Sequence, residues 1–307
     1  MSDALPKKAI LLVNTMSRTG AEAFEEACQL LGETDIELID AVAMDDPMRI
    51  DAIVKDAVAR APMVIIGGGD GSLSSNIDHF VGTDTVFAAL PLGTANSFAH
   101  TIDMPLALSD AIAMIAAGRK RRIDVGKIEN HCFINAAALG LSPLIAETVP
   151  DKLKKYLGKA GYLIWALRSL VRFRPFRLRL TREDGKCDQL WATEIRIANG
   201  THHGGVELIE RARLDDGEIT IQAVTGTSVV GLAWSWFATL SKLKSRHGTV
   251  REWHGKSFTL DTRPHQDISI DGEVDARTPV EIRCLKGAVW IAAPREGQRQ
   301  SDLAQTS

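Results

Sequence analysis

The sequence lacks the features of several protein classes. Its four cysteines, Cys28, Cys132, Cys187 and Cys284, lie far apart and form no C-x-x-C pair, so neither a zinc site nor a disulfide framework is predicted. No stretch reaches the ~18 consecutive apolar residues of a membrane-spanning helix, and the polar segment Met1–Lys8 has no signal-peptide pattern. A net charge of −3 provides no basic field for nucleic acid. These absences predict a cytoplasmic protein that binds no nucleic acid, with peripheral contact at a membrane left open.

The composition is that of a folded globular chain. Of the 307 residues, 45% are hydrophobic and 24% are charged, which is ordinary for globular domains. This length is sufficient for two domains of common size. Nothing in the composition indicates the oligomeric state.

A glycine-rich turn follows an apolar segment in the first third of the chain. Met63–Ile66 is apolar without alternation, which predicts a buried strand. Gly67–Ser72 comes next, and its glycines allow a phosphate to approach main-chain N–H groups. Asp70 within this turn suggests a Mg²⁺ ion or a hydroxyl proton between carboxylate and phosphate. An ordinary strand–turn–helix connection explains a lone turn of this kind equally well.

A second such turn makes the functional interpretation stronger. The apolar segment Val86–Leu90 predicts another strand, and Pro91–Phe98 follows it with the sequence PLGTANSF. Turns that follow two parallel strands lie at the same edge of a sheet, where ligands bind.

At these two turns the chain resembles a known family. GGDGS followed by PLGTAN is similar to the lipid kinases of the diacylglycerol kinase and sphingosine kinase family, in its bacterial form, which are distant relatives of NAD kinase and phosphofructokinase. The resemblance implies an ATP-dependent, magnesium-requiring enzyme of lipid metabolism, with a role in phospholipid biosynthesis.

The resemblance also implies which residues contact the nucleotide. The family's first turn reads N-P-x-S-G-x-G, and Asn14, Ser17 and Gly20 match it here, while Thr15 and Arg18 depart from it. The nucleotide-binding residues carried over from the family are Asn14, Ser17, Gly68, Gly69, Asp70, Gly71, Ser72, Gly93 and Thr94.

The pattern of elements changes near residue 122. Upstream, predicted strands alternate with helices, which favours a parallel sheet, and downstream most segments are alternating strands. We therefore expect an α/β nucleotide-binding domain of the NAD kinase and phosphofructokinase type at residues 1–122. We expect an antiparallel β-sandwich that binds the lipid substrate at residues 123–307. Whether its C-terminal tail packs on the first domain is left open. The basic run Arg119–Arg122 is typical of a solvated turn, with a phosphate or headgroup contact as the alternative.

Three later segments resemble further motifs of the family. Phe133–Gly140 and Ala198–Gly200 match its F-x-N and A-N-G segments, and Ala212–Gly217 matches a turn that holds a structural Mg²⁺ in bacterial members. Carried over, Asp216 is the side-chain ligand, joined by the main-chain carbonyls of Arg213 and Glu218. A simple β-turn is the competing interpretation.

The segment Ile268–Glu273 contains the D-G-E motif that carries the catalytic base in the family. Two carboxylates that flank a glycine can face one cavity, and we favour Glu273 as the base with Asp271 in support. Asp70 is the third candidate, and the sequence leaves open which of the three accepts the proton. Ser97 departs from the family, which usually has aspartate at that position.

Two segments have the pattern of helices at a membrane surface. Residues from Lys152 to Arg182 include ten Lys and Arg but no Asp or Glu, and Ser228–His247 combines two tryptophans with a basic end. Such stretches suit an anionic membrane surface, although packing on a sheet explains their apolar faces as well.

Together these features predict an ATP-dependent kinase that phosphorylates a hydroxyl of a lipid alcohol such as diacylglycerol, ceramide or a sphingoid base. A kinase for a soluble substrate, of the NAD kinase type, is one alternative, although the D-G-E and A-N-G motifs fit the lipid branch better. The other is a catalytically silent regulator that binds nucleotide or lipid, which Ser97 favours.

Overall fold

The structure is a computed structural model of the chain. It describes residues 3–16, 20–140, 174–203, 206–207, 209, 212–226, 250–271 and 273–295. Ser17 and most of the two predicted surface helices, at residues 152–173 and 228–247, lie outside these ranges. Within the described ranges, no helix is both long enough and apolar enough to cross a bilayer.

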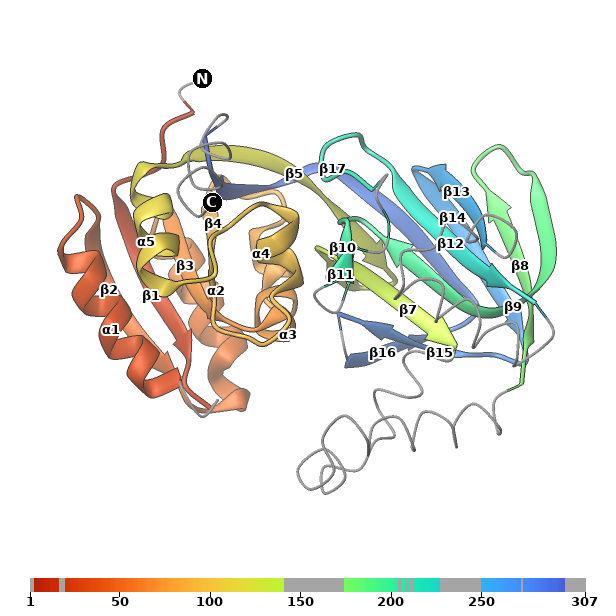
Figure 1. The fold of residues 1–307 in the computed structure, drawn as a ribbon, viewed down its shortest axis with the longest axis horizontal. Coiled ribbons are helices and arrows are strands. Elements are labelled where there is room, and N and C mark those ends of the chain that lie inside the picture. Colours follow the sequence, from red (N-terminus) through yellow and green to blue (C-terminus); the bar gives the residue numbers. More distant parts are fainter. Residues whose placement is uncertain are drawn as a thin grey trace, which may run out of the picture.

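The first part of the chain is built on a parallel sheet (Figure 1). Its strands pair in the order β2-β1-β3-β4, all parallel. Their bounds are β1 (Lys8–Asn14), β2 (Glu37–Met44), β3 (Met63–Gly68) and β4 (Val86–Pro91). Strands β3 and β4 are buried along their whole length, as the uninterrupted apolar runs predict.

Short helices connect and cover these strands. They are α1 (Gly20–Gly32), the 3₁₀ helix η1 (Pro47–Arg49), α2 (Ile50–Arg60), α3 (Asp70–Ser74), the 3₁₀ helix η2 (Ile77–Phe80), α4 (Ser97–Thr101) and α5 (Leu108–Ala117). Helix α1 packs against α5, and α2 packs against η2. Helices α3 and α4 begin directly after the two glycine-containing turns, at the carboxyl ends of β3 and β4.

The second part consists of antiparallel strands. They are β6 (His131–Phe133), β7 (Ala136–Gly140), β8 (Phe176–Arg182), β9 (Cys187–Ala198), β10 (His202–His203), β11 (Val206–Glu207), β12 (Ile219–Thr225), β13 (Val250–Gly255), β14 (Ser257–Arg263), β15 (Asp267–Ile270) and β16 (Glu273–Arg277). The first half of β9 pairs with β8, and its second half lies between β7 and β12. Alternate residues of β8, namely Phe176, Leu178 and Leu180, point into a separate apolar core. The predicted class, a parallel α/β domain followed by an antiparallel β-sandwich, is confirmed.

Two long strands connect the two parts (Figure 1). Strand β5 (Arg119–Ile128) pairs antiparallel with β17 (Val280–Ala293) and crosses the expected boundary at residue 122. The start of β17 pairs with β14 of the sandwich, and its end pairs parallel with β4 of the first sheet. The sequence suggested two strands here, at Val280–Cys284 and Val289–Ala292. The structure joins them into one, with an irregularity between Leu285 and Val289.

Other local differences have tertiary causes. The basic run Arg119–Arg122 is not a solvated turn but the start of β5, because Lys120 and Arg122 lie over the ring of Trp290 at 4.9 and 4.6 Å. The single strand predicted over Cys132–Ala138 is divided into β6 and β7, which pair with different neighbours.

Candidate active site

The GGDG turn closes strand β3 against the first turn of helix α3. Gly68 packs directly on Ser72, because a Cβ at Gly68 would lie 2.6 Å from the Ser72 Cβ. At the end of β1, the Nδ2 of Asn14 donates a hydrogen bond to the Ser72 hydroxyl at 2.8 Å. Two of the turns predicted to bind nucleotide therefore meet at the carboxyl edge of the parallel sheet.

The PLGTAN turn lies against the GGDG turn, backbone to backbone. A Cβ on Gly93 would come within 2.6 Å of the Gly69 Cα. Asn96 adopts a left-handed conformation with φ 46°, and its Oδ1 accepts a hydrogen bond from the Gly93 N–H at 2.8 Å. The Oδ1 of Asp70 accepts a hydrogen bond from the Phe98 N–H at 3.0 Å, in the first turn of α4. One oxygen of Asp70 is therefore occupied in holding the second turn against the first.

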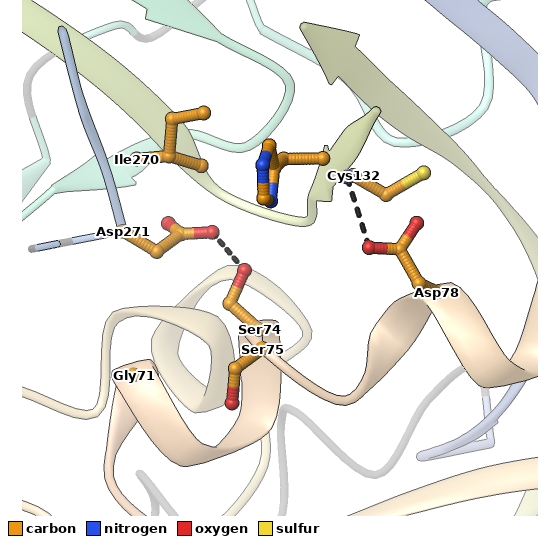
Figure 2. A pocket seen from close by; sticks show the side chains of 8 residues that line it. Gly71, Ser74, Ser75, Asp78, Cys132, Ile270 and Asp271 are labelled. Atoms are coloured by element: carbon orange, nitrogen blue, oxygen red, sulfur yellow. Dashed lines mark hydrogen bonds between the residues drawn. The ribbon is translucent and has the colours of Figure 1, made fainter. Parts of the chain in front are cut away.

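Asp271 reaches the same place from the second part of the chain. It has a φ of 46° and lies between β15 and β16, where its N–H donates to the Ala136 carbonyl at 3.1 Å. Its Oδ1 accepts a hydrogen bond from the Ala136 N–H at 3.2 Å. Its Oδ2 accepts one from the hydroxyl of Ser74 on helix α3 (Figure 2). Ser74 and Asp271 thus connect the two parts directly.

A cavity of about 240 Å³ surrounds this contact. It is lined by residues from both parts of the chain, namely Gly71, Ser74, Ser75, Asp78, His131, Cys132, Ile270 and Asp271 (Figure 2). Helix α3, which begins within the GGDG turn, and Asp271 of the D-G-E segment therefore line one cavity, as the kinase prediction requires.

The environment of Asp271 suits a proton acceptor. The pKa of its carboxyl is raised from 3.8 to about 6, mainly by burial; the hydrogen bonds from Ser74 and Ala136 oppose this rise, and the negative charge of Asp70 contributes to it. The influence of Asp70 shows that the two carboxylates are electrostatically coupled. A carboxylate that titrates near neutral pH can accept a proton from a hydroxyl group.

The raised pKa of Asp271 predicts a pH-dependent stability. Because the pKa rises from 3.8 to about 6 on folding, ionisation of Asp271 destabilises the folded state. We expect the free energy of unfolding of wild type, relative to the Asp271→Asn variant, to fall by about 3 kcal/mol as the pH rises through this interval and then to stay level. Urea unfolding at a series of pH values measures this difference. The variant Asp267→Asn, at an exposed position on β15, serves as control, and a difference that does not change with pH would contradict the assignment.

The structure also locates the other predicted site residues. Thr94 is exposed in the PLGTAN turn, and Ser97 is buried at the start of α4. Glu273 begins strand β16, opposite Ile270, but its side chain and Ser17 lie outside the described residues.

The predicted magnesium turn is organised by a residue that the sequence analysis did not single out. Asp124 on β5 is buried and accepts hydrogen bonds from the Gly217 N–H at 2.6 Å and the Gly287 N–H at 2.7 Å. The Oδ1 of Asp216 accepts a hydrogen bond from the Glu218 N–H at 3.0 Å. The sequence contained one signal for this role, because Asp124 is a charged residue inside the apolar segment that follows the basic run Arg119–Arg122.

The charges around this turn fit a hard cation. The pKa of the Cys284 thiol is raised to about 12 by burial first and then by the charges of Asp124, Asp216 and Glu218, while the charge of Lys286 lowers it, so three carboxylates and one ammonium group act on this thiol. Within the described ranges, however, no group of three or more His, Cys, Asp and Glu side chains is arranged to bind a metal ion. A Mg²⁺ ion here would rely on main-chain carbonyls, such as that of Arg213, in addition to Asp216.

Comparison with known families agrees with this architecture. Residues 8–128 match the diacylglycerol kinase catalytic domain, and residues 136–293 match the YegS C-terminal NAD kinase β-sandwich-like domain. The fold and the site thus define a kinase with the diacylglycerol kinase type of catalytic domain. More particularly, the chain belongs to the YegS family of lipid kinases.

Individual relatives span almost the whole chain. It is 30% identical over 294 residues to the protein named "Probable lipid kinase YegS" from Escherichia coli O9:H4 (strain HS), with 93% of this chain and 96% of that protein aligned. It is 28% identical over 286 residues to a YegS-like relative from Klebsiella pneumoniae (strain 342), covering 90% and 95% of the two chains. The crystal structure of a diacylglycerol kinase from Bacillus anthracis str. Sterne has the same fold, with a TM-score of 0.75, 21% identity and coverage of 94% and 97%.

These comparisons confirm two predictions. The resemblance to the diacylglycerol kinase and sphingosine kinase family is confirmed, and so is the prediction of an enzyme, because the chain carries the catalytic domain of a kinase family. Membership of that family implies the use of ATP.

Proposed function

We propose that this protein transfers the γ-phosphoryl group of ATP to a hydroxyl of a lipid alcohol such as diacylglycerol, ceramide or a sphingoid base. The observation that carries this proposal is the contact between Ser74 and Asp271, which brings a carboxylate of the sandwich to the GGDG helix inside one cavity. Phosphoryl transfer needs such an arrangement, because its catalysis consists mostly of positioning and charge stabilisation.

The nucleotide would bind along the edge of the parallel sheet. We place its phosphates against the turn after Asn14, the backbone of Gly68–Ser72, and Gly93 with Thr94, because glycines place no Cβ between the main chain and a ligand. A Mg²⁺ ion bound with ATP near Asp70 would neutralise phosphate charge.

We assign the proton acceptor to Asp271. It lines the cavity and its carboxyl has a pKa of about 6, whereas Asp70 is not among the described residues that line the cavity. The sequence interpretation favoured Glu273, whose side chain lies outside the described residues. Asp271 would take the proton of the acceptor hydroxyl as that oxygen attacks the γ-phosphorus and the bond to the β–γ bridging oxygen breaks, which releases ADP. Ser74 would hold the carboxylate in place.

A second magnesium role is proposed at the turn of Asp216. We expect Mg²⁺ to raise the free energy of unfolding by about 2 to 3 kcal/mol at a concentration near 100 times its Kd, since an ion that binds only the folded state stabilises it. The Asp216→Ala variant should lose this effect, whereas Asp215→Ala, which removes a salt bridge to Arg121, should keep it. Thermal unfolding with and without Mg²⁺ measures the difference, and equal stabilisation of all three proteins would refute the site.

Peripheral contact with an anionic membrane, on the cytoplasmic side, is part of the same proposal. The described part of the basic stretch supports it, because Arg177 on β8 lies opposite Trp191 on β9, and both are exposed. Arginine beside an exposed tryptophan is typical of a surface that rests on anionic lipid.

The decisive experiment is a screen with radiolabelled ATP against lipid alcohols in mixed micelles, with NAD as the soluble alternative. We expect label in at least one lipid, and a higher rate when anionic lipid is included at low salt. Label in NAD alone would replace the proposal by a soluble-substrate kinase, and no turnover with any acceptor would indicate a regulator. A rate that ignores anionic lipid and salt would argue against the membrane contact.

A further inference from the structure

A groove opens on the first part of the chain, between strand β2 and helix α2. It has a volume of about 460 Å³ and shares no lining residue with the cavity at Asp271. Most of its lining residues are apolar, and they include the buried Ile10 and Leu12 of β1. The groove is therefore an apolar surface that the proposed chemistry does not use.

The groove lies at the free edge of the parallel sheet. Strand β2 is at one end of the sheet order, whereas β15 and β16, which flank Asp271, are at the other. Within the described ranges, β2 pairs only with β1. It lies on the side of the first part that faces away from the second part (Figure 1). A partner that binds here therefore leaves the cavity at Asp271 uncovered.

Met48 lines this groove and projects into solvent. Its side chain is 90% exposed, more than any other large apolar side chain in the described part of the chain. Its backbone is held in place, because Oδ1 of Asp46 accepts a hydrogen bond from the Met48 N–H at 3.0 Å and Pro47 begins the 3₁₀ helix η1. An apolar side chain that is presented to water in this way gains free energy when a partner covers it.

Two unpaired charges belong to the same groove. Asp45 and Arg49 line it, both are exposed, and neither side chain has a hydrogen bond or an ion pair within the described ranges. The other charged lining residues satisfy one another, because Arg60 donates hydrogen bonds to Asp56 at 2.7 Å and to Asp40 at 3.0 Å. The groove thus offers one free carboxylate and one free guanidinium group to a partner.

The charge of this segment restricts the kind of partner. Residues 40–56 contain five Asp and only two cations, Arg49 and Lys55, so they repel an anionic membrane or a nucleic acid. A second copy of the chain fits better, since one surface carries an apolar projection, an apolar groove and a free charge of each sign. A twofold axis brings each of these features to its complement on the other copy.

We propose that the surface formed by β2, η1 and α2, here called the Met48 surface, is the contact between two copies of this chain in a symmetric dimer. Met48 of each copy enters the groove of the other, and Asp45 pairs with the partner's Arg49. Methionine suits this role because its unbranched, flexible side chain fills irregular apolar gaps. The dimer does not depend on the proposed kinase activity, since the Met48 surface and the cavity at Asp271 have no residue in common.

Sedimentation velocity of the full chain, at about 1 to 100 μM to cover micromolar affinities, tests the dimer. We expect a species of twice the 33.4 kDa mass of one chain. For Met48→Asp we expect the Kd of the dimer to rise at least about 100-fold, because both copies lose a buried methionine. Leu106→Asp is the matched control, since Leu106 is an exposed apolar residue that does not line the groove, and it should keep the wild-type Kd.

Charge reversal tests how the two copies are oriented. Asp45→Arg alone and Arg49→Asp alone should each raise the Kd at least about tenfold, because like charges then face each other twice in the dimer. An equimolar mixture of the two variants should dimerise as tightly as wild type, since every contact between them again joins opposite charges. A variant that dissociates only because it is misfolded is not rescued by such mixing.

Three results would overturn the proposal. The first is a wild-type protein that stays monomeric over the whole concentration range, and the second is a dimer that persists in Met48→Asp. The third is a mixture of the two charge variants that remains monomeric, because Asp45 then does not face the partner's Arg49. All variants change exposed positions, so circular dichroism should show the wild-type fold in each of them.

Discussion

Replacement of Asp271 by asparagine should lower kcat by about 10² to 10⁴-fold while leaving the KM for ATP close to that of wild type. The size of the effect is that of losing a general base, and asparagine keeps the volume and the acceptor oxygen that receives the Ala136 N–H. The fold should therefore persist. Steady-state kinetics with the lipid identified by the screen, together with circular dichroism, measures both effects.

The pH dependence of the wild-type enzyme provides a second readout for Asp271. Since the carboxylate must be ionised to accept a proton, kcat/KM should rise with pH through an apparent pKa near 6. Asp267→Asn, on the strand β15 that precedes Asp271, should keep both the rate and this pH profile. If Asp271→Asn retains activity within about threefold of wild type, the base is Glu273 or Asp70 instead.

Replacement of Gly93 by alanine should reduce activity by at least about 10²-fold, because a displacement of about 1 Å at a positioning group has that effect. The new Cβ would lie 2.6 Å from the Gly69 Cα and 2.9 Å from the Asn96 Oδ1. Since the nearer atom belongs to the backbone, it cannot rotate away, and the two turns must separate. The expected loss of stability is about 1 to 3 kcal/mol, the usual cost of overpacking.

The measurements for Gly93→Ala are ATP affinity by calorimetry and the free energy of unfolding by urea. Gly32→Ala is the matched control, because a Cβ at the end of helix α1 would have no atom within 4 Å, and it should behave as wild type. Wild-type ATP affinity in Gly93→Ala would show that the contact between the two turns does not form the nucleotide site.

The local patterns of the chain predicted the architecture well. Buried parallel strands have uninterrupted apolar sequences, so Met63–Ile66 and Val86–Leu90 were identified as β3 and β4 together with the turns that follow them. The alternation in β8 similarly indicated a strand with one buried face. Such patterns are readable because they depend on neighbours within a few residues along the chain.

Contacts between segments that are distant in the sequence could not be predicted from such local patterns. Ser74 has no local signature in the sequence. It belongs to the site only because Asp271, 197 positions further along the chain, lies against helix α3. Asp78 likewise becomes part of a cavity only through its hydrogen bond to Cys132. The basic run Arg119–Arg122 was interpreted as a solvated turn because its packing partner is remote in the sequence. Two of its cations lie over the ring of Trp290, near the other end of the chain.

The D-G-E segment shows which features the sequence predicts and which ones only the tertiary structure decides. Its sequence predicted that a carboxylate of this segment accepts a proton, and favoured Glu273 over Asp271 without excluding either. Asp271 faces the cavity because a left-handed backbone at φ 46° and two hydrogen bonds with Ala136 orient it there. Composition and periodicity thus determined the class of fold and the positions of the two glycine-containing turns, since these follow from local backbone and burial preferences. Which side chains share the cavity, and with what pKa and charge, was decided by packing between segments that are remote in the chain.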